Sequence, residues 1–173
     1  AGCGALITLF LSIAPEERLR GMLFWLIGDF SQGVNPTFAL IGIAALGLLV
    51  APLARDLNVL VRGNDNACTL GVSVNYVRVA VYLIASMATA ISVTTAGSVG
   101  FVGLVIPHLT RMIVGNDQRI LLPTAIFAGG IFLVLADTLA RILIAPQQLP
   151  VGVVTALIGV PVFLYLLNRT RYQ

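Results

Sequence analysis

The stretch "GSVGFVGLVIPHLTRMIVGNDQR", Gly97 to Arg119, decides how this chain folds. It contains the end of a run without acidic or basic residues that begins after Arg78 and does not end until His108. One membrane-spanning helix needs about 20 apolar residues, so the run is too long for one straight helix. Glycine permits tight turns and proline removes a helix donor, so we expect a turn between one span over residues 77–96 and another over 99–114. The residues that mark this turn are Gly97, Gly100, Gly103, Pro107, His108 and Arg111.

The composition indicates a membrane protein. Of the 173 residues, 58% are hydrophobic and 10% are charged, whereas a soluble domain carries about 25% charged residues. The formal net charge is +3, and the arginines are scattered between apolar blocks. A nucleic-acid-binding protein gathers its basic residues in a dense patch, so we expect no nucleic-acid partner. Cys3 and Cys68 have no neighbouring ligand residues, so we predict neither a metal site nor a disulfide framework.

Apolar segments follow one another along the whole chain. We expect residues 1–173 to form a single transmembrane domain, an all-α polytopic helical bundle. The first segment is short and stops at "PEER", which is consistent with the second part of a truncated span. The expected spans are residues 1–14, 37–54, 77–96, 99–114, 120–145 and 151–167.

Arginines beside the short loops predict the orientation of the chain. Arg55, Arg62 and Arg78 flank the loop after the 37–54 span, and Arg111 and Arg119 flank the next loop on the same side. We expect these ends to face the cytoplasm.

The opposite side carries "RGMLFWLIGDFSQGVNP", residues 20–36, which is too short to cross a bilayer. Trp25 and Phe24 are typical of the membrane interface, and Gly33 and Pro36 are expected to end the segment. We expect a short helix at the outer surface; an ordinary amphipathic loop is the alternative.

The longest polar stretch on the cytoplasmic side is the loop over residues 55–76. Asn64 and Asp65 are predicted to cap a short helix, and Gly71 is predicted to end it, because glycine accepts the left-handed turn at a helix end. A loop that displays apolar side chains usually docks into a partner. The alternative is that these side chains fold back onto the membrane domain. They are Leu57, Leu60, Val61 and Leu70.

Several ordered motifs resemble the FecCD-type permeases, the membrane subunits of ATP-binding-cassette importers for iron-siderophores, haem and cobalamin. They are "GSVGFVGLVIPHLTR", "GNDQRILLP", "LADTLAR" and "LPVGVVTALIGVPVFLYLL". The loop "ARDLNVLVRGNDNACTLGVSV" is similar to the family's coupling loop, and "FWLIGDFSQG" to its short outer-surface helix. The resemblance implies a ten-helix fold of which this chain is the C-terminal half. Arg62 and Gln118 depart from the leucine and histidine usual in the family.

The resemblance also implies partners for a multi-pass protein in the bacterial inner membrane. A second permease subunit or half completes the dimer in the lipid, and an extracytoplasmic binding protein delivers the substrate. Separate ATPase subunits bind ATP and magnesium, so no cofactor and no catalytic residue is expected in this chain. No Gly-rich loop ending in Lys and Ser or Thr occurs in the sequence. The loop residues implied to enter the ATPase groove are Asn64, Asp65, Asn66, Ala67, Leu70, Gly71 and Val72.

Charged residues within a span mark functional candidates, because an isolated charge costs several kcal/mol in hydrocarbon. Asp137 and Arg141 stand four apart on one predicted helix and can pair on the same face. The resemblance implies that Arg141 docks acidic residues of the binding protein. Arg18 and Arg20 are expected on the same side, where they add to that surface or pair with the neighbouring Glu16 and Glu17.

His108 is the only histidine, and a catalytic metal site needs about three converging ligands. We expect it to hydrogen-bond backbone groups released by Pro107. Two other functions remain as alternatives to the importer: a membrane enzyme using His108 and Asp137, and an ion-coupled secondary transporter using Asp137.

Overall fold

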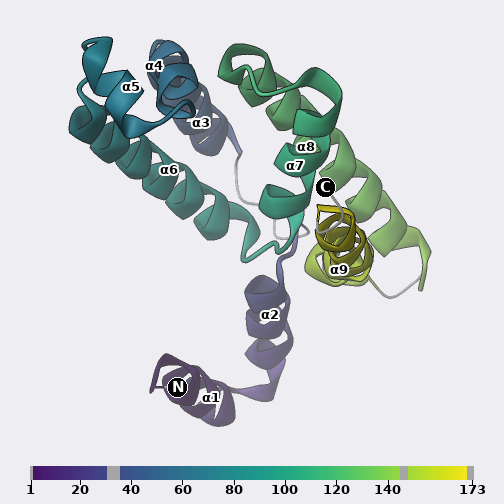
Figure 1. Ribbon diagram of the computed structural model, residues 1–173. Helices are drawn as coiled ribbons and strands as arrows, with labels where there is room; N and C mark the ends of the chain where they lie inside the picture. Colours follow the sequence, from purple (N-terminus) through teal and green to yellow (C-terminus); the bar gives the residue numbers. More distant parts are fainter. Residues whose placement is uncertain (1, 31–35, 145–147, 171–173) are drawn as a thin grey trace.

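The computed structural model describes residues 2–30, 36–144 and 148–170, and these residues form helices joined by turns (Figure 1). The all-α fold predicted from the sequence is confirmed. The helices of the described ranges are α1 (Gly2–Ile13), α2 (Glu16–Ile27), α3 (Thr37–Val50), α4 (Leu53–Leu60), α5 (Asn64–Thr69), α6 (Val74–Ala96), α7 (Val102–Val114), α8 (Gln118–Ile142) and α9 (Val151–Thr170).

Three helices of the described chain, α6, α8 and α9, are long and apolar enough to cross a membrane. The pair α3 and α4 makes a fourth if it is counted as one broken span. Helices α1 and α7 contain 12 and 13 residues, which rise about 18 to 20 Å and fall short of the roughly 30 Å of hydrocarbon. The expected spans 1–14 and 99–114 are helical over most of their length, and α7 is too short to cross alone.

The expected span 37–54 is broken near its end. Helix α3 stops at Val50, and α4 begins at Leu53 after a bend of 58°. Pro52 lies in this break, where its missing N–H and its ring prevent the helix from continuing straight. The loop expected over residues 55–76 therefore begins with α4, and its last residues already belong to the first turn of α6.

The expected ends of the other spans shift by a few residues. Helix α7 starts at Val102 because residues 97–101 form the turn, and α8 starts at Gln118, directly after the capping residue Asp117. Helix α8 ends at Ile142, and Ala145, the expected end, lies outside the described residues.

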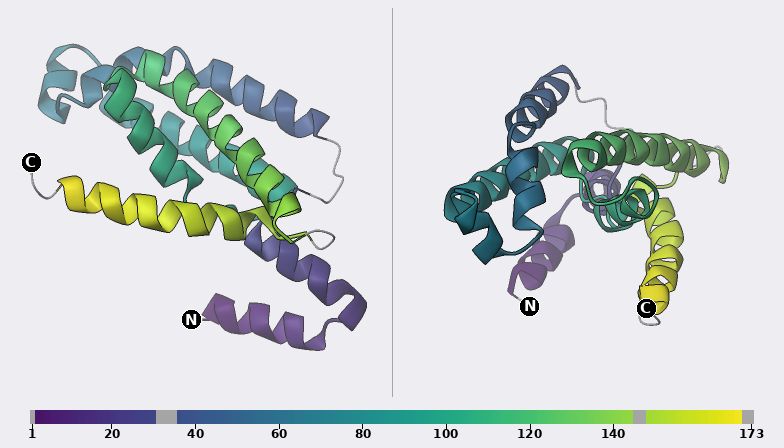
Figure 2. Two further views of the ribbon diagram at one scale, coloured as in Figure 1. Left: turned by 90° about the vertical axis from the view of Figure 1, so that its right-hand side faces the viewer. Right: turned by 45° about the horizontal axis from the view of Figure 1, so that its top comes forward.

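The helices form two groups. Helix α3 packs on α6, and α7, α8 and α9 pack on one another (Figure 1). Helix α4 contacts both α6 and α8, so it bridges the groups at one end of the bundle (Figure 2). Helices α1 and α2 form a V at the other end.

The best-packed apolar cluster lies where α8 ends and α9 begins. Small side chains let these helices approach closely, as is usual between helices in membranes. The buried members of the cluster are Ala136, Ala140, Val151 and Val154.

Candidate functional site

The loop between α4 and α6 contains the short helix α5, at the end of the bundle where α7 finishes and α8 starts (Figure 2). The residue before α5 is Gly63, which has a φ of 113°, a value that glycine adopts readily and other residues rarely do. Asn64 and Asp65 were expected to cap the helix, but they lie inside its first turn and make no side-chain capping bond. Instead the Asn66 amide donates to the Arg62 carbonyl oxygen at 2.9 Å. The cap assignment was wrong by one residue, because a left-handed glycine turns the chain into the helix.

The end of α5 agrees with the prediction. Gly71 has a φ of 77°. Its N–H donates to the Cys68 carbonyl at 3.0 Å, and the N–H of Val72 donates to that of Ala67 at 3.0 Å. This pair of bonds is a Schellman motif, which satisfies the last carbonyls of the helix. The loop is therefore a compact helical knob.

The side chains of this knob divide between exposed and packed. Val61 and Leu70 are 63% and 69% exposed, whereas Leu57 and Leu60 are partly buried. Of the residues implied for ATPase contact, Ala67 is fully buried and Val72 partly buried. Ala67 can therefore only support the knob, while the others present an accessible surface. They are Asn64, Asp65, Asn66, Leu70 and Gly71.

A polar contact that the sequence did not reveal ties this knob to α8. The Asn58 side chain, on α4, donates from Nδ2 to Asp117 Oδ1 at 2.6 Å. Its Oδ1 accepts from the Gln118 N–H at 2.7 Å. The Arg119 N–H also donates to Asp117 Oδ1, at 3.0 Å. The bond from Asn58, followed by that from Arg119, holds the pKa of Asp117 below its ordinary value. An Asp before a helix is a recognisable capping signal, but its partner 59 positions away is not.

At the opposite end, the turn after α6 closes against the end of α2. Gly97 has a φ of 73°, and a Cβ there would overlap the Trp25 carbonyl oxygen. The Ser98 hydroxyl donates to the Leu26 carbonyl, and the Asp29 N–H donates to the Ala96 carbonyl at 3.0 Å. Gly97 therefore lies in the turn, as expected, and packs closely against the end of α2.

Helix α9 meets the same end of α2. A Cβ on Gly152 would overlap the Ile27 carbonyl oxygen, and the Gly152 N–H donates to the Gly28 carbonyl at 3.3 Å. Gly28, with a φ of 101°, ends α2. Helix α2 therefore stops before Gly33, the expected terminator, which lies outside the described residues.

Gly100 lies in the turn, as expected, whereas Gly103 lies inside α7, and neither glycine is closely packed. A Cβ at either position would meet no atom of the described chain within 4 Å, and neither has a left-handed φ. The residue that does is Phe101, with a φ of 65°, which is rare for a bulky side chain. It is held by α9, because its Cβ lies where a side chain on Gly159 would have to be.

The expected role of His108 was also wrong. Its side chain is exposed and makes no hydrogen bond to the described chain. The hydroxyl of Thr110, which is buried, donates to the carbonyls of Ile106 and Pro107 at 2.9 and 3.1 Å. Thr110 is therefore the side chain bonded to backbone beside Pro107. Arg111 lies exposed in the last turn of α7.

Arg141 and Asp137 form the expected pair. Arg141 Nε lies 2.8 Å from Asp137 Oδ2, and the two side chains are 44% and 26% exposed. Asp29, a buried residue just beyond α2, adds a second negative charge that interacts with Arg141. Asp29 was not singled out from the sequence, although it is the one acidic residue of an otherwise apolar segment. Arg141 thus pairs with Asp137, interacts more weakly with Asp29, and still reaches solvent.

Arg18 and Arg20 lie exposed on α2. Arg20 stacks over the Phe24 ring at 5.2 Å from its centroid. Within the described chain, neither arginine pairs with Glu16 or Glu17. The alternative of local pairing is therefore wrong, and both cations remain accessible.

Comparison with known proteins decides which family has this arrangement of helices. The family model described as the FecCD transport family matches residues 1–169. The chain belongs to the FecCD transport family.

FecCD relatives agree with this assignment over nearly the whole chain. The cobalamin import system permease protein BtuC of Halobacterium salinarum is 42% identical over 94% of this chain and 44% of its own length. The hemin transport system permease protein HmuU of Yersinia pestis is 39% identical over 99% and 52%. The Fe(3+) dicitrate transport system permease protein FecD of Escherichia coli is 41% identical over 99% and 54%. The chain therefore spans about half the length of these relatives.

A solved structure supports the FecCD fold. It shows an inward-facing conformation of an ABC transporter described as of metal-chelate type, with a TM-score of 0.86 and 34% identity. It covers 96% of this chain, and this chain covers 55% of it. The predicted family resemblance is confirmed.

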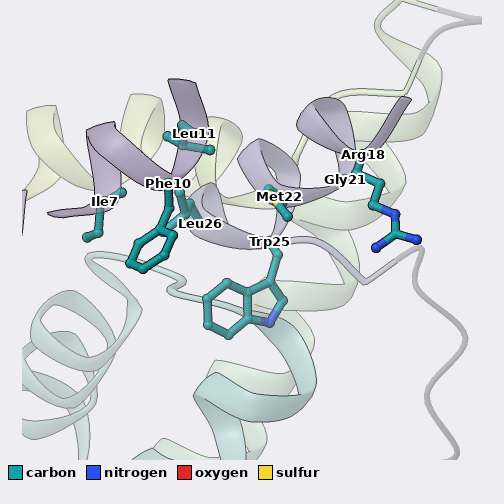
Figure 3. Close-up of a pocket in the computed structure, with 8 residues that line it drawn as sticks. All are labelled: Ile7, Phe10, Leu11, Arg18, Gly21, Met22, Trp25 and Leu26. Atoms are coloured by element: carbon teal, nitrogen blue, oxygen red, sulfur yellow. The ribbon is translucent and has the colours of Figure 1, made fainter. Parts of the chain in front are cut away.

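Two further features of this FecCD chain bear on binding. An open apolar groove of about 550 Å³ separates α1 from α2, with Phe10 and Trp25 side by side and the Arg18 guanidinium away from them (Figure 3). In the part of the chain that the structure describes, no three His, Cys, Asp or Glu side chains gather where they could hold a metal ion. The groove is lined by Ile7, Phe10, Leu11, Arg18, Gly21, Met22, Trp25 and Leu26.

Proposed function

We propose that this chain is part of a transmembrane permease subunit of an ATP-binding-cassette importer that carries a metal chelate into the cytoplasm. The observation that carries the proposal is the FecCD family match over residues 1–169. The named relatives handle cobalamin, hemin and ferric dicitrate, each a metal ion enclosed by an organic chelator. The cargo class is therefore a metal chelate, with an iron-siderophore, haem or cobalamin as its members.

The ATPase partner docks on the knob around α5. Exposed Val61 and Leu70 supply apolar contact, and Asn64 and Asp65 supply polar contact beside them. Large exposed apolar side chains at a polar end of the molecule are typical of a protein interface. ATP and magnesium bind to that ATPase subunit, and this chain contributes no catalytic group.

The extracytoplasmic binding protein docks at the other end, on Arg141, Arg18 and Arg20. Arg141 is held in place by Asp137 and remains 44% exposed, so it presents an oriented guanidinium to an acidic partner. Lipid and a second permease subunit or half surround the remaining apolar surface. The whole assembly lies in the cell membrane, with α5 toward the cytoplasm.

The alternative functions find less support. A proton-coupled transporter would use Asp137 as its proton-binding group, but Arg141 Nε already lies 2.8 Å from Asp137 Oδ2, so this carboxylate is engaged by a neighbour on its own helix. An enzyme needs His108 and Asp137 together. Helices α7 and α8 pack side by side and are joined by the turn after Val114. With antiparallel helices, Asp137 lies about 20 Å along the bundle from His108.

Copurification tests the proposal. The full-length permease that contains this chain is expected to retain an ATPase subunit, and the loaded binding protein is expected to stimulate ATP hydrolysis. Probes are cobalamin, haemin and ferric dicitrate, each loaded separately on the binding protein. A permease that retains no ATPase and takes up a probe alone would contradict the proposal.

A further inference from the structure

Helix α4 joins the two helix groups of the bundle, and the Asn58 side chain makes the polar part of that contact. The amide uses both of its ends: Nδ2 donates to the Asp117 carboxylate, and Oδ1 accepts from the Gln118 backbone. An apolar side chain could make neither bond, and a carboxylate could make only the second. The contact therefore requires an asparagine or its geometric equivalent.

We propose that Asn58 is a positioning residue that couples movement of the ATPase-docking knob to helix α8. This inference rests on the proposed importer function and adds a residue outside the loop residues implied for ATPase contact. Its partner Asp117 precedes the first residue of α8, so a displacement of α4 acts directly on the start of that helix.

Helix α8 can carry such a displacement to the other end of the molecule. It has 25 residues, which correspond to about 37 Å of helix. Its far end carries the Asp137–Arg141 pair and the buried Ala136 and Ala140, which pack against α9. Helix α8 continues through Pro123 without a break, and coupling between sites is carried by chains of packed elements of this kind. The route runs from α5 through α4 and Asn58 to α8.

The position of the contact favours a role in positioning over one in stability. The Asn58–Asp117 bond lies at an exposed part of the surface. Exposed polar pairs contribute little to folding, because water competes for both partners. The two short bonds instead fix the register between α4 and α8: one is charge-assisted, from Asn58 to the Asp117 carboxylate, and the other ties Asn58 to the backbone of Gln118.

A swap of the two side chains tests the proposal in the full-length permease, reconstituted with its ATPase and binding protein in liposomes. Asn58→Asp places two carboxylates against each other, and like charges repel. Uptake of probe per ATP hydrolysed is expected to fall about tenfold, in the usual range for coupling between sites. Asp117→Asn leaves an amide oxygen to accept both bonds and is expected to change the ratio less than about twofold.

The double variant Asn58→Asp with Asp117→Asn has the wild-type net charge. Its new amide at position 117 can donate to the new carboxylate at position 58, so the ratio is expected to return to within about twofold of wild type. Asn75→Asp is the matched control, because it adds the same charge at an exposed position of the first turn of α6. A general loss of folding or of ATPase docking would not be reversed by the swap.

Two results would overturn the inference. One is a wild-type ratio in Asn58→Asp; the other is a double variant as impaired as the single one. Both leave the importer function intact as long as wild-type uptake requires ATP hydrolysis. Wild-type uptake that continues with a disabled ATPase would instead contradict the proposed function.

Discussion

The two ends of the helix bundle are fastened in different ways. At the end of α2, the chain is packed backbone against backbone, with Gly97 against Trp25 and Gly152 against Ile27. At the end of α5, the contact between α4 and α8 includes a hydrogen bond between the Asn58 and Asp117 side chains at the exposed surface, where water can compete for both partners. Close backbone packing allows only one arrangement of the helices, whereas polar side chains can form hydrogen bonds in several arrangements. We infer that the first end acts as a fixed support and the second as the part that moves.

The largest expected effect comes from breaking the fixed end. Gly97→Ala places a Cβ on the Trp25 carbonyl and imposes a left-handed φ on alanine. The backbone oxygen cannot rotate away as a flexible side chain could, so we expect a loss of about 2 kcal/mol or more in stability. Thermal unfolding of the permease in detergent measures it.

Gly100→Ala is the control for that variant, because its Cβ would meet no described atom within 4 Å. A change within about 0.5 kcal/mol is expected there. Equal losses from the two variants would show that the turn does not depend on close packing at Gly97.

The second effect concerns Arg141, which lies at the fixed end but faces solvent. Arg141→Glu removes the partner of Asp137 and adds a third negative charge near Asp29. Affinity for the binding protein is expected to fall about tenfold or more, because acidic groups would meet acidic groups. Arg141→Lys keeps the charge and should retain most of the affinity, as titration of the two proteins would show. Wild-type docking by the glutamate variant would exclude Arg141 from the interface.

A smaller effect is expected at the exposed surface of the moving end. Leu70 is 69% exposed at the end of α5. Leu70→Ser should therefore weaken ATPase association by about tenfold without unfolding the loop, since truncated interface anchors typically lose that much. Cys68→Ser, an exposed and nearly isosteric change on the same helix, should bind normally. Equal binding by all three proteins would place the interface elsewhere.

The smallest expected effect is that of pH on the polar contact. The lowered pKa of Asp117 means that its contribution is present above the ordinary aspartate pKa and is lost only as the pH falls through the lowered value. Between about pH 5 and 8 the Asp117 carboxylate stays charged. Uptake per ATP hydrolysed should therefore differ between the wild type and Asn58→Ala by the same factor across this range. A ratio that titrates near pH 6 would show that another group controls the contact.

Local signals in the sequence predicted most of the helices, because the apolar segments and the glycines and prolines that end them are neighbours in the sequence. Gly71 ended α5 as expected, and the Arg141–Asp137 pair follows from a spacing of four on one helix. Pro52 was read as part of a span although proline is a local signal for a break. That error was avoidable.

Long-range features could not be predicted in this way. Gly97 is packed against α2, which lies about 70 positions earlier in the sequence, whereas Gly100 is not. The sequence of the turn alone does not distinguish the two glycines. The left-handed Phe101 depends on Gly159 in α9. Asn58 and Asp117 are each unremarkable polar residues until the fold brings them together. Contacts of this kind depend on the tertiary arrangement, which the pattern of a single sequence does not reveal directly.

We propose that ATP hydrolysis on a partner subunit drives cargo movement through the permease that contains this chain. Uptake of cobalamin, haemin and ferric dicitrate should be measured in vesicles that hold the full-length permease with either an intact ATPase or one unable to hydrolyse ATP. We expect uptake of one of the probes with the intact ATPase and none with the disabled one. This uptake should be unchanged when the proton gradient is dissipated. Uptake that persists with the disabled ATPase and collapses with the gradient would contradict it.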